Sequence, residues 1–420
     1  MSLFQKIAFF LLLATIPIQL GKHFWPDFSF VQGIRIDYLS PTFYLSDLSF
    51  LFLFFCSYNS VLKRFFKILY SRAGALLVIC LVLSTIFSAN WLAAFYGIVK
   101  LFEFFYIGVF VSMFFKKREM ELSQFTFTIG ALVESIILFF QFVSQHSLGG
   151  VFYFLGERTF SVSTPGISTF QFMGQELLRP YGTFPHPNVV AFYLLLTIVW
   201  LLSSISLQKE SRSYLKIFAV AVISLGVLLT FSRVIILLLI TVIVFYIYKM
   251  AKNKSKKVRL TLIGMIIFGS ILLGALFFQR FEITLVKDLL LRMELVIISV
   301  SIFISHLALG TGLNNFFYSE AMYQNNLSPI LMQPVHNIYL LWLTQTGIAG
   351  FAVAAYFIRG LIAKLLKRLT PKSDSFYEFS SIVILCIGIA GFFDHYFLTL
   401  QQGQILTAIV IGFCFSKINS

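Results

Sequence analysis

The chain has 420 residues, of which 59% are hydrophobic and only 12% are charged, and 52 of them are phenylalanine. A soluble domain carries roughly a quarter charged residues, and no single core in water grows this large. This composition therefore excludes an ordinary water-soluble fold and indicates a protein whose solvent is lipid. The net charge of +15 comes from short basic clusters between apolar runs, which is typical of membrane topology and not of a nucleic-acid-binding face.

Twelve apolar runs are long enough to cross a bilayer, for which about 20 residues are needed. Backbone polar groups must pair internally in lipid, so each run is predicted to be a helix. The fold class is therefore all-α, a polytopic transmembrane bundle with residues 1–420 forming a single membrane domain. The predicted spans are 4–21, 44–62, 73–89, 91–115, 123–143, 188–207, 216–231, 234–249, 260–279, 338–358, 377–393 and 403–416.

The basic residues predict the orientation of these spans. In a twelve-span chain, 23 of the 32 Lys and Arg residues fall on one side, eight fall on the other, and Lys100 lies within a span. The positive-inside rule makes the basic-rich side cytoplasmic, so both termini are predicted to be cytoplasmic. All six histidines then fall on the opposite, outer side. The four cysteines lie inside apolar runs and show no metal-binding spacing.

Three outer segments are long enough to build a site: residues 22–43, 144–187 and 280–337. The third contains an apolar stretch, 293–309, that could itself cross the membrane. A crossing there would place the cluster from Arg359 to Lys372 outside, against the charge rule. We therefore expect a partly helical outer segment that lies against or dips into the outer face of the bilayer.

A polar segment leads into the sixth predicted span, from Arg179 to Asn188. Its prolines at positions 185 and 187 exclude a helix interior, so the segment is predicted to turn the chain into the bilayer. Asn188 is expected to cap the helix, and the free amides of that helix end, with Arg179 nearby, would form an anion site. A simple loop-to-helix junction without a ligand fits the same residues.

Other polar residues gather at the outer ends of the predicted spans. Arg233 separates the seventh and eighth spans, where an arginine either snorkels to the interface or pairs with an anion. His336 precedes the tenth span; its ordinary pKa near 6.5 suits a proton acceptor, although a structural histidine is the alternative. Lys100 and Glu103 lie three residues apart on one helix face and are expected to neutralise each other.

These motifs, in this order, resemble the O-antigen ligase family of bacterial membrane glycan transferases, which includes related polymerases and protein glycosyltransferases. The resemblance covers roughly residues 175–355. Its elements are Arg179–Gly182–Phe184–Asn188 entering a helix, Ser232–Arg233 at a helix junction, Arg292 in the outer segment, Gly310-x-Gly312 with Asn315–Phe316, and His336–Asn337-x-Tyr339 with Gly347-x-x-Gly350. One departure is Thr344-Gln-Thr346 before Gly347, where many relatives carry a glutamate, so any role of that carboxylate is in doubt.

The resemblance implies transfer of a glycan from undecaprenyl pyrophosphate to an acceptor hydroxyl on the periplasmic face of the cytoplasmic (inner) membrane, without a metal or another cofactor. It implies that Arg233 and Arg292, with Arg179, bind the pyrophosphate and that His336 activates the acceptor. Asn188, Asn315 and Asn337 would support the site. The expected partners are the lipid-linked glycan donor, a glycan or lipid A–core-like acceptor and membrane lipid, but no nucleic acid.

Residue chemistry agrees with these roles. Arginines stay charged and offer planar, bidentate donors to a pyrophosphate leaving group. A neutral histidine can take a proton from the attacking hydroxyl. A polymerase of the same superfamily, which differs only in its acceptor, remains an alternative, as does a protein-glycosylating member. A transporter or flippase for lipid-linked sugars would need ionisable residues near the bilayer midplane, where only Lys100, Glu103 and Glu134 fit.

Overall fold

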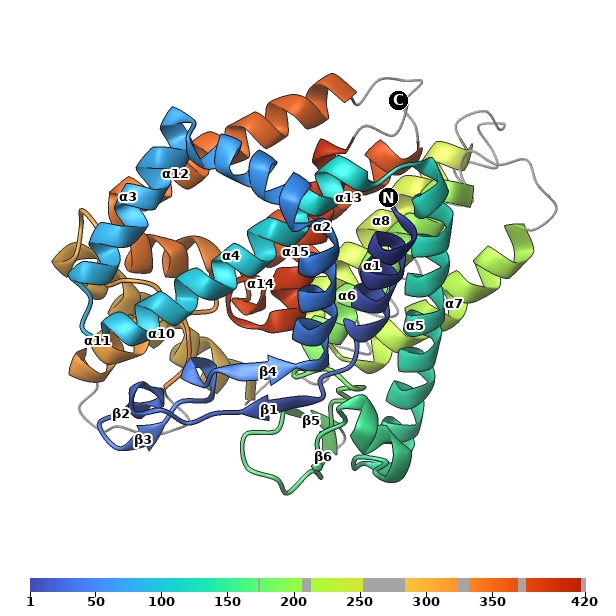
Figure 1. Cartoon of the computed structure of the whole chain (residues 1–420). Helices are drawn as coiled ribbons and strands as arrows, with labels where there is room; N and C mark the ends of the chain where they lie inside the picture. The colour runs from blue at the N-terminus through green and yellow to red at the C-terminus, as the bar shows by residue number, and fades with distance from the viewer. Residues whose placement is uncertain (173, 206–212, 252–283, 324–331, 369–374, 417–420) are drawn as a thin grey trace.

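The computed structural model describes residues 1–172, 174–205, 213–251, 284–323, 332–368 and 375–416. The predicted ninth span, residues 260–279, lies outside these ranges. The described chain is predominantly helical, and its helices pack into one bundle with short strands at one end (Figure 1). The predicted all-helical bundle is thus confirmed in its main feature, while small strands had not been predicted.

Eleven of the twelve predicted spans coincide with apolar helices in the described ranges. Six of these are long and apolar enough to cross a membrane: α2 (Leu45–Leu69), α4 (Trp91–Phe114), α5 (Lys117–Ser144), α6 (Pro187–Ile205), α8 (Arg233–Ala251) and α12 (Ile338–Arg368). Five are apolar but shorter: α1 (Leu3–Thr15), α3 (Arg72–Ile86), α7 (Ser213–Leu229), α13 (Ser375–Ala390) and α15 (Gln401–Phe415). The chain is a multi-pass membrane protein, and the count of twelve crossings stays a prediction.

Helix α6 forms the centre of the bundle. It packs against α5, α7, α8, α13 and α15, and most of its residues are buried inside the protein. Trp200 of α6 stacks on Phe379 of α13 with ring centroids 4.6 Å apart. Peripheral helices instead expose large apolar side chains, such as Phe55 and Leu237. Since a soluble protein rarely exposes so many of them, these outer faces are suited to lipid.

Short strands and turns cover one end of the bundle. In the described part of the chain they form three antiparallel ribbons: β1 (Gly21–His23) with β4 (Thr42–Tyr44), β2 (Phe30–Val31) with β3 (Ile34–Arg35), and β5 (Thr169–Phe172) with β6 (Gln175–Leu178). Lys22 lies opposite Phe43, and Phe170 lies opposite Leu177. Three 3-10 turns complete this layer: η1 (Asp27–Ser29), η2 (Asp37–Leu39) and η3 (Gly150–Leu155). These ribbons and turns come from the first two predicted outer segments, the first of which they exceed by one residue at each edge.

The third predicted outer segment contains α10 (Thr284–Ser305) and the short helix α11 (Phe316–Tyr323). Helix α10 is not among the six helices long and apolar enough to cross, although it exposes Ile297. A turn after α10 is tied to α12 by hydrogen bonds from Thr311 N to Thr344 O (2.9 Å) and from Gly312 N to Gln345 O (3.0 Å). This pairing fixes the first turns of α12 against the loop that follows α10.

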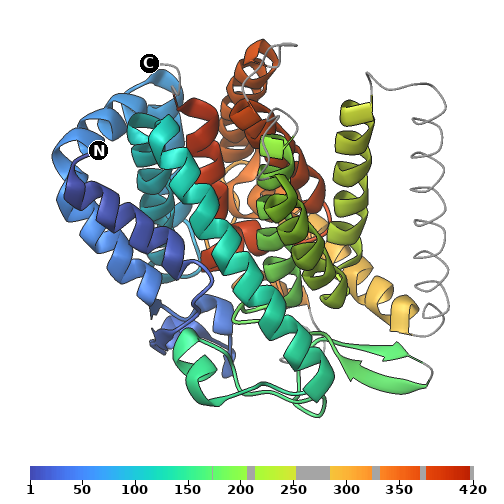
Figure 2. The same cartoon turned by 90° about the vertical axis from the view of Figure 1, so that its right-hand side faces the viewer.

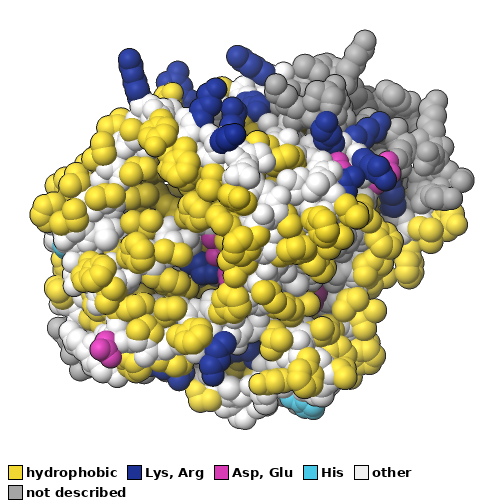
Figure 3. Space-filling model, viewed as in Figure 1, with side chains coloured by type: hydrophobic (Ala, Val, Ile, Leu, Met, Phe, Trp, Pro, Cys, Tyr) yellow, Lys and Arg dark blue, Asp and Glu magenta, His cyan; other side chains and the backbone are white. Residues whose placement is uncertain are grey.

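Charge is distributed unevenly along the bundle axis. Figures 1 and 2 place the start of α1 and the end of α15 away from the end that carries the strands. In the space-filling view, Lys and Arg side chains gather along the upper edge, above a broad hydrophobic face, while few lie near the strands at the bottom (Figure 3). On the face shown, the described Lys and Arg side chains therefore gather at the end of the bundle away from the strands.

Candidate functional site

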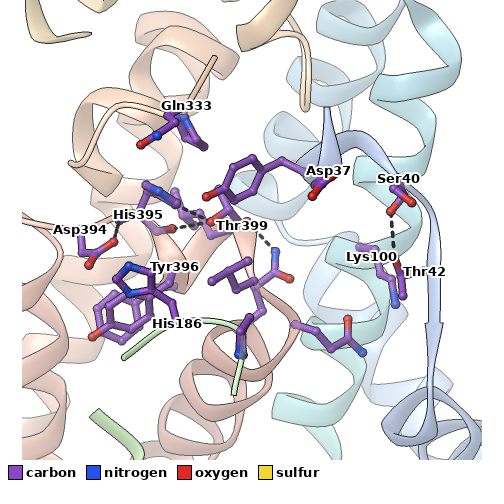
Figure 4. A pocket seen from close by; sticks show the side chains of 18 of the residues that line it. Asp37, Ser40, Thr42, Lys100, His186, Gln333, Asp394, His395, Tyr396 and Thr399 are labelled. Atoms are coloured by element: carbon purple, nitrogen blue, oxygen red, sulfur yellow. Dashed lines mark hydrogen bonds between the residues drawn. The ribbon is translucent and has the colours of Figure 1, made fainter. Parts of the chain in front are cut away.

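A cavity of about 1170 Å³ lies between the bundle and the layer of strands and turns. Its lining comes from segments far apart in the sequence, including η2, the loop before α6, α10, the start of α12 and the α13–α14 connection. In Figure 4, His186, Asp394 and His395 lie on one side of the cavity and Lys100 on the other, with Thr399 between them. The cavity therefore has two polar regions, one around Asp394 and the other around Lys100, and the two regions differ in charge.

His336 lies in the cavity wall two residues before α12 begins at Ile338. Its position is fixed by Asn337, whose Oδ1 accepts from the backbone N–H groups of Tyr339 (3.0 Å) and Leu340 (2.9 Å) and so caps the helix. The His336 ring meets the His395 ring edge-on, with centroids 5.0 Å apart. Within the described residues, His336 Nδ1 is buried without a hydrogen-bond partner.

The surroundings of His336 keep its imidazole neutral. Burial, assisted by the neighbouring His395 and by the charge of Arg292, lowers the pKa of His336 to about 3. Asp394 opposes this shift and raises the pKa. A neutral imidazole can accept a proton, so the protonation state needed by a general base is already present at neutral pH.

Asp394 is the carboxylate at the centre of this end of the cavity. It follows α13 and precedes α14 (Tyr396–Thr399). Although burial raises its pKa, the surrounding histidines 395, 186 and 336 and a hydrogen bond from Asn188 hold the pKa of Asp394 below its usual value. Asn188 Nδ2 donates to Asp394 Oδ2 at 2.6 Å. Asp394 is therefore an anion among three imidazoles.

The structure corrects the prediction that Asn188 caps α6. Helix α6 begins at Pro187, so Asn188 lies inside its first turn and is not the cap. His186 takes the capping role, because its Nδ1 accepts from the backbone N–H of Asn188 at 3.1 Å. Proline is favoured as the first residue of a helix, where its missing N–H removes no hydrogen bond. The Asn188 side chain is thereby left to bridge Asp394 and Arg179.

Arg179 is held by neutral acceptors on three sides. Its Nη2 donates to Asn188 Oδ1 (2.8 Å), its Nη1 to Ser168 Oγ (2.8 Å) and its Nε to the carbonyl of Thr230 (3.0 Å). Burial lowers the pKa of Arg179 to about 10, which leaves it charged at neutral pH, and the nearby charges of Arg233 and Arg292 act in the same direction. The guanidinium therefore connects the loop before α6 to the α7–α8 junction.

Helix α5 anchors the loop that carries Arg179. The carboxylate of Glu134 accepts from the backbone N–H of Thr183 at 3.0 Å. Gln141 Oε1 accepts from the N–H groups of Tyr181 (3.0 Å) and Gly182 (2.8 Å). Gly182 has a φ of 62°, a backbone conformation that favours glycine, and a Cβ there would lie 2.1 Å from Glu134 Oε2. Glu134, considered for transport, thus holds a loop in place.

The other predicted arginines lie in different settings. Arg292 of α10 lines the cavity, and its Nη1 donates to the carbonyl of Phe393 at 3.0 Å. Within the described residues the Arg292 guanidinium makes no other hydrogen bond, so most of its donors are left for a ligand. Arg233 is the first residue of α8, is exposed and lies outside the cavity lining. Arg233 is still close enough for its charge to lower the pKa of Arg179.

Asn315 and Asn337 act within the protein framework. Asn315 is fully buried, and its side chain exchanges hydrogen bonds with the backbone of Asn90 (2.7 and 3.0 Å). It therefore joins the turn after α10 to the start of α4. Asn337 caps α12 and also donates to the carbonyl of Phe392 at 3.4 Å. Both residues fix the loops around the cavity, and neither is part of its lining.

At the other polar region, Lys100 contacts two carboxylates. Its Nζ lies 2.7 Å from Asp47 Oδ1 and 2.9 Å from Glu103 Oε2. Gln401 Nε2 donates to Asp47 Oδ1 at 2.8 Å and to Glu103 Oε1 at 3.2 Å. The predicted pairing of Lys100 with Glu103 is present, but Asp47 had not been foreseen and gives the cluster a formal charge of −1.

In the described ranges, no three His, Cys, Asp or Glu side chains are arranged to hold a metal ion.

Comparison with protein families connects this geometry to known proteins. A family model described as O-antigen ligase matches residues 218–355. The resemblance to the O-antigen ligase family is confirmed. The matched region includes Arg233, Arg292, Asn315, His336 and Asn337. A search of curated proteins finds no match to the chain.

Asp394 and His395 were not selected from the sequence as site residues. His395 was noted only as one of six outer histidines, and Asp394 lies 58 positions after His336 and outside the matched region. A signal was available, because the pair stands between the apolar runs of α13 and α15, where a buried carboxylate needs a partner. The sequence does not reveal that this partner is the start of α6.

Proposed function

We propose that this protein transfers a glycan from undecaprenyl pyrophosphate to a hydroxyl group of an acceptor at the end of the bundle that carries the strands. The observation that carries the proposal is the grouping of His336, Arg292 and Asp394 around one cavity in a chain that matches the O-antigen ligase family. The cavity is large enough to bring a diphosphate and two sugar units together, since ligand sites of several hundred Å³ hold ligands of that size.

In the proposed reaction, the acceptor oxygen attacks the anomeric carbon of the donor sugar. The bond from that carbon to the pyrophosphate oxygen breaks, and its electron pair leaves with the pyrophosphate. The hydroxyl proton passes to the imidazole of His336. General base catalysis of this kind contributes roughly 10²–10⁴-fold. The neutral state of His336, which follows from its burial, supports this role.

Arg292 is proposed to neutralise the charge that develops on the leaving pyrophosphate, so that no metal ion is required. Guanidinium groups bind phosphate oxygens in pairs, and such contacts are stronger where water is excluded. Arg179 and Arg233 add to the positive field at this end, although the donors of Arg179 are taken up by protein acceptors. Binding of the diphosphate beside Arg292 would raise the pKa of His336 towards a value more useful to a base.

Asp394 is proposed to stabilise the imidazolium that forms when His336 accepts the proton. Its charge already raises the pKa of His336, and the same interaction grows when that ring becomes positive. Asn188 and Arg179 hold the carboxylate in position through the hydrogen-bond chain described above. The proposed site therefore contains a base, an anion that stabilises its protonated form and a cation for the leaving group.

The proposed location is the cytoplasmic (inner) membrane, with both termini in the cytoplasm and the cavity on the periplasmic side. The gathering of basic side chains at the end opposite the strands supports this orientation (Figure 3). A lipid-linked glycan polymerase would use the same base and cations and would differ in its acceptor. Transport has less support, because Lys100 is paired with two carboxylates and Glu134 holds a loop.

The proposal is tested by transfer from a radiolabelled undecaprenyl-pyrophosphate glycan in reconstituted vesicles. Lipid A–core and a second lipid-linked glycan are offered separately as acceptors to the wild type and to His336→Ala. We expect product on one acceptor and a loss of roughly 10²-fold or more in His336→Ala, with donor binding retained. The control is His146→Ala, which changes an exposed histidine away from the cavity. Label that crosses the bilayer unchanged in both proteins would replace the proposal with transport.

A further inference from the structure

Arg158 is a cation in the cavity lining that the proposed transfer chemistry does not use. It lies between η3 and β5, in the layer of strands and turns, and it is exposed. Within the described part of the chain, Arg158 makes neither a hydrogen bond nor an ion pair. By contrast, three protein acceptors bind the guanidinium of Arg179. The donors of Arg158 are therefore open to a ligand in the cavity.

The loop that carries Arg158 is held in a fixed position. Its neighbour Glu157 is buried, and the Glu157 carboxylate accepts from Gln141 Nε2 at 2.8 Å and from two backbone N–H groups before η3, both at 2.7 Å. Gly156 has a φ of 89°, and a Cβ there would lie 2.4 Å from the backbone nitrogen of Leu20. The loop thus packs closely against the residues before β1. The charge of Glu157 is used inside the protein and does not neutralise Arg158.

Gln141 of α5 connects this loop to the loop that carries Arg179. Its Nε2 donates to Glu157, while its Oε1 accepts from two backbone N–H groups of the loop before α6. The two loops therefore share one anchor, which holds Arg158 and Arg179 in a fixed relation. Arg179 belongs to the end of the cavity where the pyrophosphate of the donor is proposed to bind. Arg158 is thus part of the donor side of the cavity.

Tyr38 of η2 connects Arg158 to the proposed transfer site. The Tyr38 ring meets the His395 ring edge-on, with centroids 5.4 Å apart. Burial raises the pKa of Tyr38, the charge of Asp394 raises it further, and the charge of Arg158 lowers it. Arg158 and Asp394 therefore lie near the same phenol. We expect the first sugars of a donor bound at the transfer site to pass Arg158.

The charges around Arg158 leave one positive charge without a counter-ion. Asp37 lies across the cavity from Asp394 (Figure 4), and its Oδ1 is 3.3 Å from Arg35 Nε, so these two charges balance each other. Burial lowers the pKa of His23, Arg158 and Arg35 lower it further, and Asp37 opposes them. All three charged groups therefore lie near one imidazole. Their formal sum is +1, which matches a ligand with a single negative charge.

A sugar carboxylate fits these groups better than a diphosphate does. A guanidinium binds a carboxylate through paired N–H donors. A diphosphate carries at least two negative charges and would also face Asp37, which repels it. The ring of Tyr153 lines the same part of the cavity and is 57% exposed, so it offers apolar surface to the face of a sugar ring.

We propose that Arg158 recognises an acidic sugar of the donor glycan, so that the protein prefers donors with a carboxylate near the reacting end. Arg158 forms paired hydrogen bonds with that carboxylate, and the Tyr153 ring packs against the sugar. This inference rests on the proposed function, because it assigns a place to the donor glycan. An unneutralised cation, held by a fixed loop in the cavity lining, carries it.

The kinetic test compares three undecaprenyl-pyrophosphate trisaccharides in the vesicle assay. Two of them carry glucuronic acid as the second or the third sugar, and the other carries glucose at both positions. We expect one acidic donor to have a kcat/KM roughly 10-fold or more above that of the neutral donor, since one paired contact of a charged group is lost without the acid. In Arg158→Gln this ratio should fall towards 1, and in Arg158→Glu it should fall below 1.

Lys22→Gln is the matched control, because Lys22 is an exposed cation of β1 in the same layer but outside the cavity lining. This variant should keep the wild-type ratio. Two results would overturn the inference. One is a wild type without preference for either acidic donor. The other is an equal loss of kcat/KM for acidic and neutral donors in Arg158→Gln, which would place Arg158 on the shared pyrophosphate.

A binding experiment without turnover separates this inference from the proposed function. Saturation-transfer NMR measures contact between the purified protein and the same acidic and neutral trisaccharides without their lipid. We expect wild-type protein to bind one acidic trisaccharide roughly 10-fold more tightly than the neutral one, and Arg158→Gln to lose the difference. Equal binding of all three by the wild type would refute the inference even if transfer occurs. A preference that depends on Arg158, without any transfer in vesicles, would refute the transfer function alone.

Discussion

His336 is one of three histidines packed around a single carboxylate. Burial lowers the pKa values of His186 and His395 as well as that of His336, so all three rings are neutral at neutral pH while Asp394 stays charged. The site is therefore prepared to receive one proton, and Asp394 is the group that would stabilise it. In this arrangement, the carboxylate matters as much as the base itself.

Replacement of Asp394 by asparagine tests that statement. The amide keeps the size of the side chain but removes the charge that raises the pKa of His336, so His336 becomes a weaker base. We expect kcat to fall roughly 10²-fold or more, with a small change in the KM for the donor. Steady-state transfer kinetics measure both quantities. A donor KM that rises while kcat is unchanged would mean that Asp394 only shapes the binding site.

Arg292→Lys separates charge from geometry at the leaving group. Lysine keeps the positive charge but cannot form the paired donors of a guanidinium. We expect a loss of roughly 10-fold or more in kcat/KM for the donor, measured in the same transfer assay. Arg72→Lys, at the start of α3 and outside the cavity lining, is the control. Wild-type rates for Arg292→Lys would show that a point charge is sufficient there.

For single residues, the sequence predicted which side chains are functional candidates more readily than it predicted which other side chains they contact. Arg292 and His336 were polar candidates between apolar runs whose roles came from the resemblance to the family, and both line the cavity. Asn188 was predicted as a cap but bridges Arg179 and Asp394. Asp47, on α2, could not be paired with Lys100, on α4, because contacts between distant helices depend on packing that periodicity does not encode.

Helix α12 illustrates how one residue sets the shape of an element. Gly347 has a φ of 64° and a ψ of −170°, a conformation essentially restricted to glycine, and it interrupts the helix ten residues after Asn337. A Cβ at this position would lie 2.4 Å from the carbonyl oxygen of Ala308. The first turns of α12, which follow His336, can therefore pack against the turn after α10 independently of the rest of the helix.

Gly347→Ala should damage both stability and activity. The new methyl group meets backbone atoms that cannot move aside, and strain of this kind costs about 1–3 kcal/mol. We expect a lower melting temperature in detergent and reduced transfer, because His336 is displaced with the start of α12. Gly360→Ala is the matched control on the same helix, since no atom lies within 4 Å of its Cβ position. Identical behaviour of the two variants would show that the break is not required.

Helices were the elements that composition predicted best, because a run of apolar residues in lipid has few alternatives to a helix. Helices α4 and α6 begin within one residue of the predicted spans. The ribbon of β1 and β4 was not predicted, since three-residue strands in a polar segment carry too short an alternation to be recognised. The interruption of α12 was also missed, although Gly347 and Gly350 were noted in the sequence.

The whole molecule should lose stability in mild acid because of its buried histidines. Burial lowers the pKa of His186 and His336 to about 3 in the folded protein, whereas an exposed histidine has a pKa of about 6.5. Below about pH 6.5, the unfolded chain binds protons that the folded chain does not, so stability falls with pH by up to about 1.4 kcal/mol per pH unit for each such histidine. Above pH 7, this contribution is complete.

Thermal unfolding in detergent between pH 8 and pH 5 measures this dependence. We expect a constant melting temperature down to about pH 7 and a decrease below pH 6.5. The double variant His186→Gln and His336→Gln should be less sensitive to acid than the wild type, while His146→Ala should follow the wild type. A wild-type melting temperature that is unchanged at pH 5 would contradict the folded-state pKa values.

The buried position of α6 has a consequence for biogenesis. Its first turn provides His186 and Asn188, yet the carboxylate that they surround and the helices that enclose α6 on one side, α13 and α15, come from the last fifty residues of the chain. A ribosome that has just completed α6 has therefore made Arg179, His186 and Asn188, but neither His336 nor Asp394. The proposed site becomes complete only when α13 and the segment with Asp394 have been added, so a chain that ends between His336 and Asp394 carries the proposed base without the carboxylate that would stabilise its protonated form.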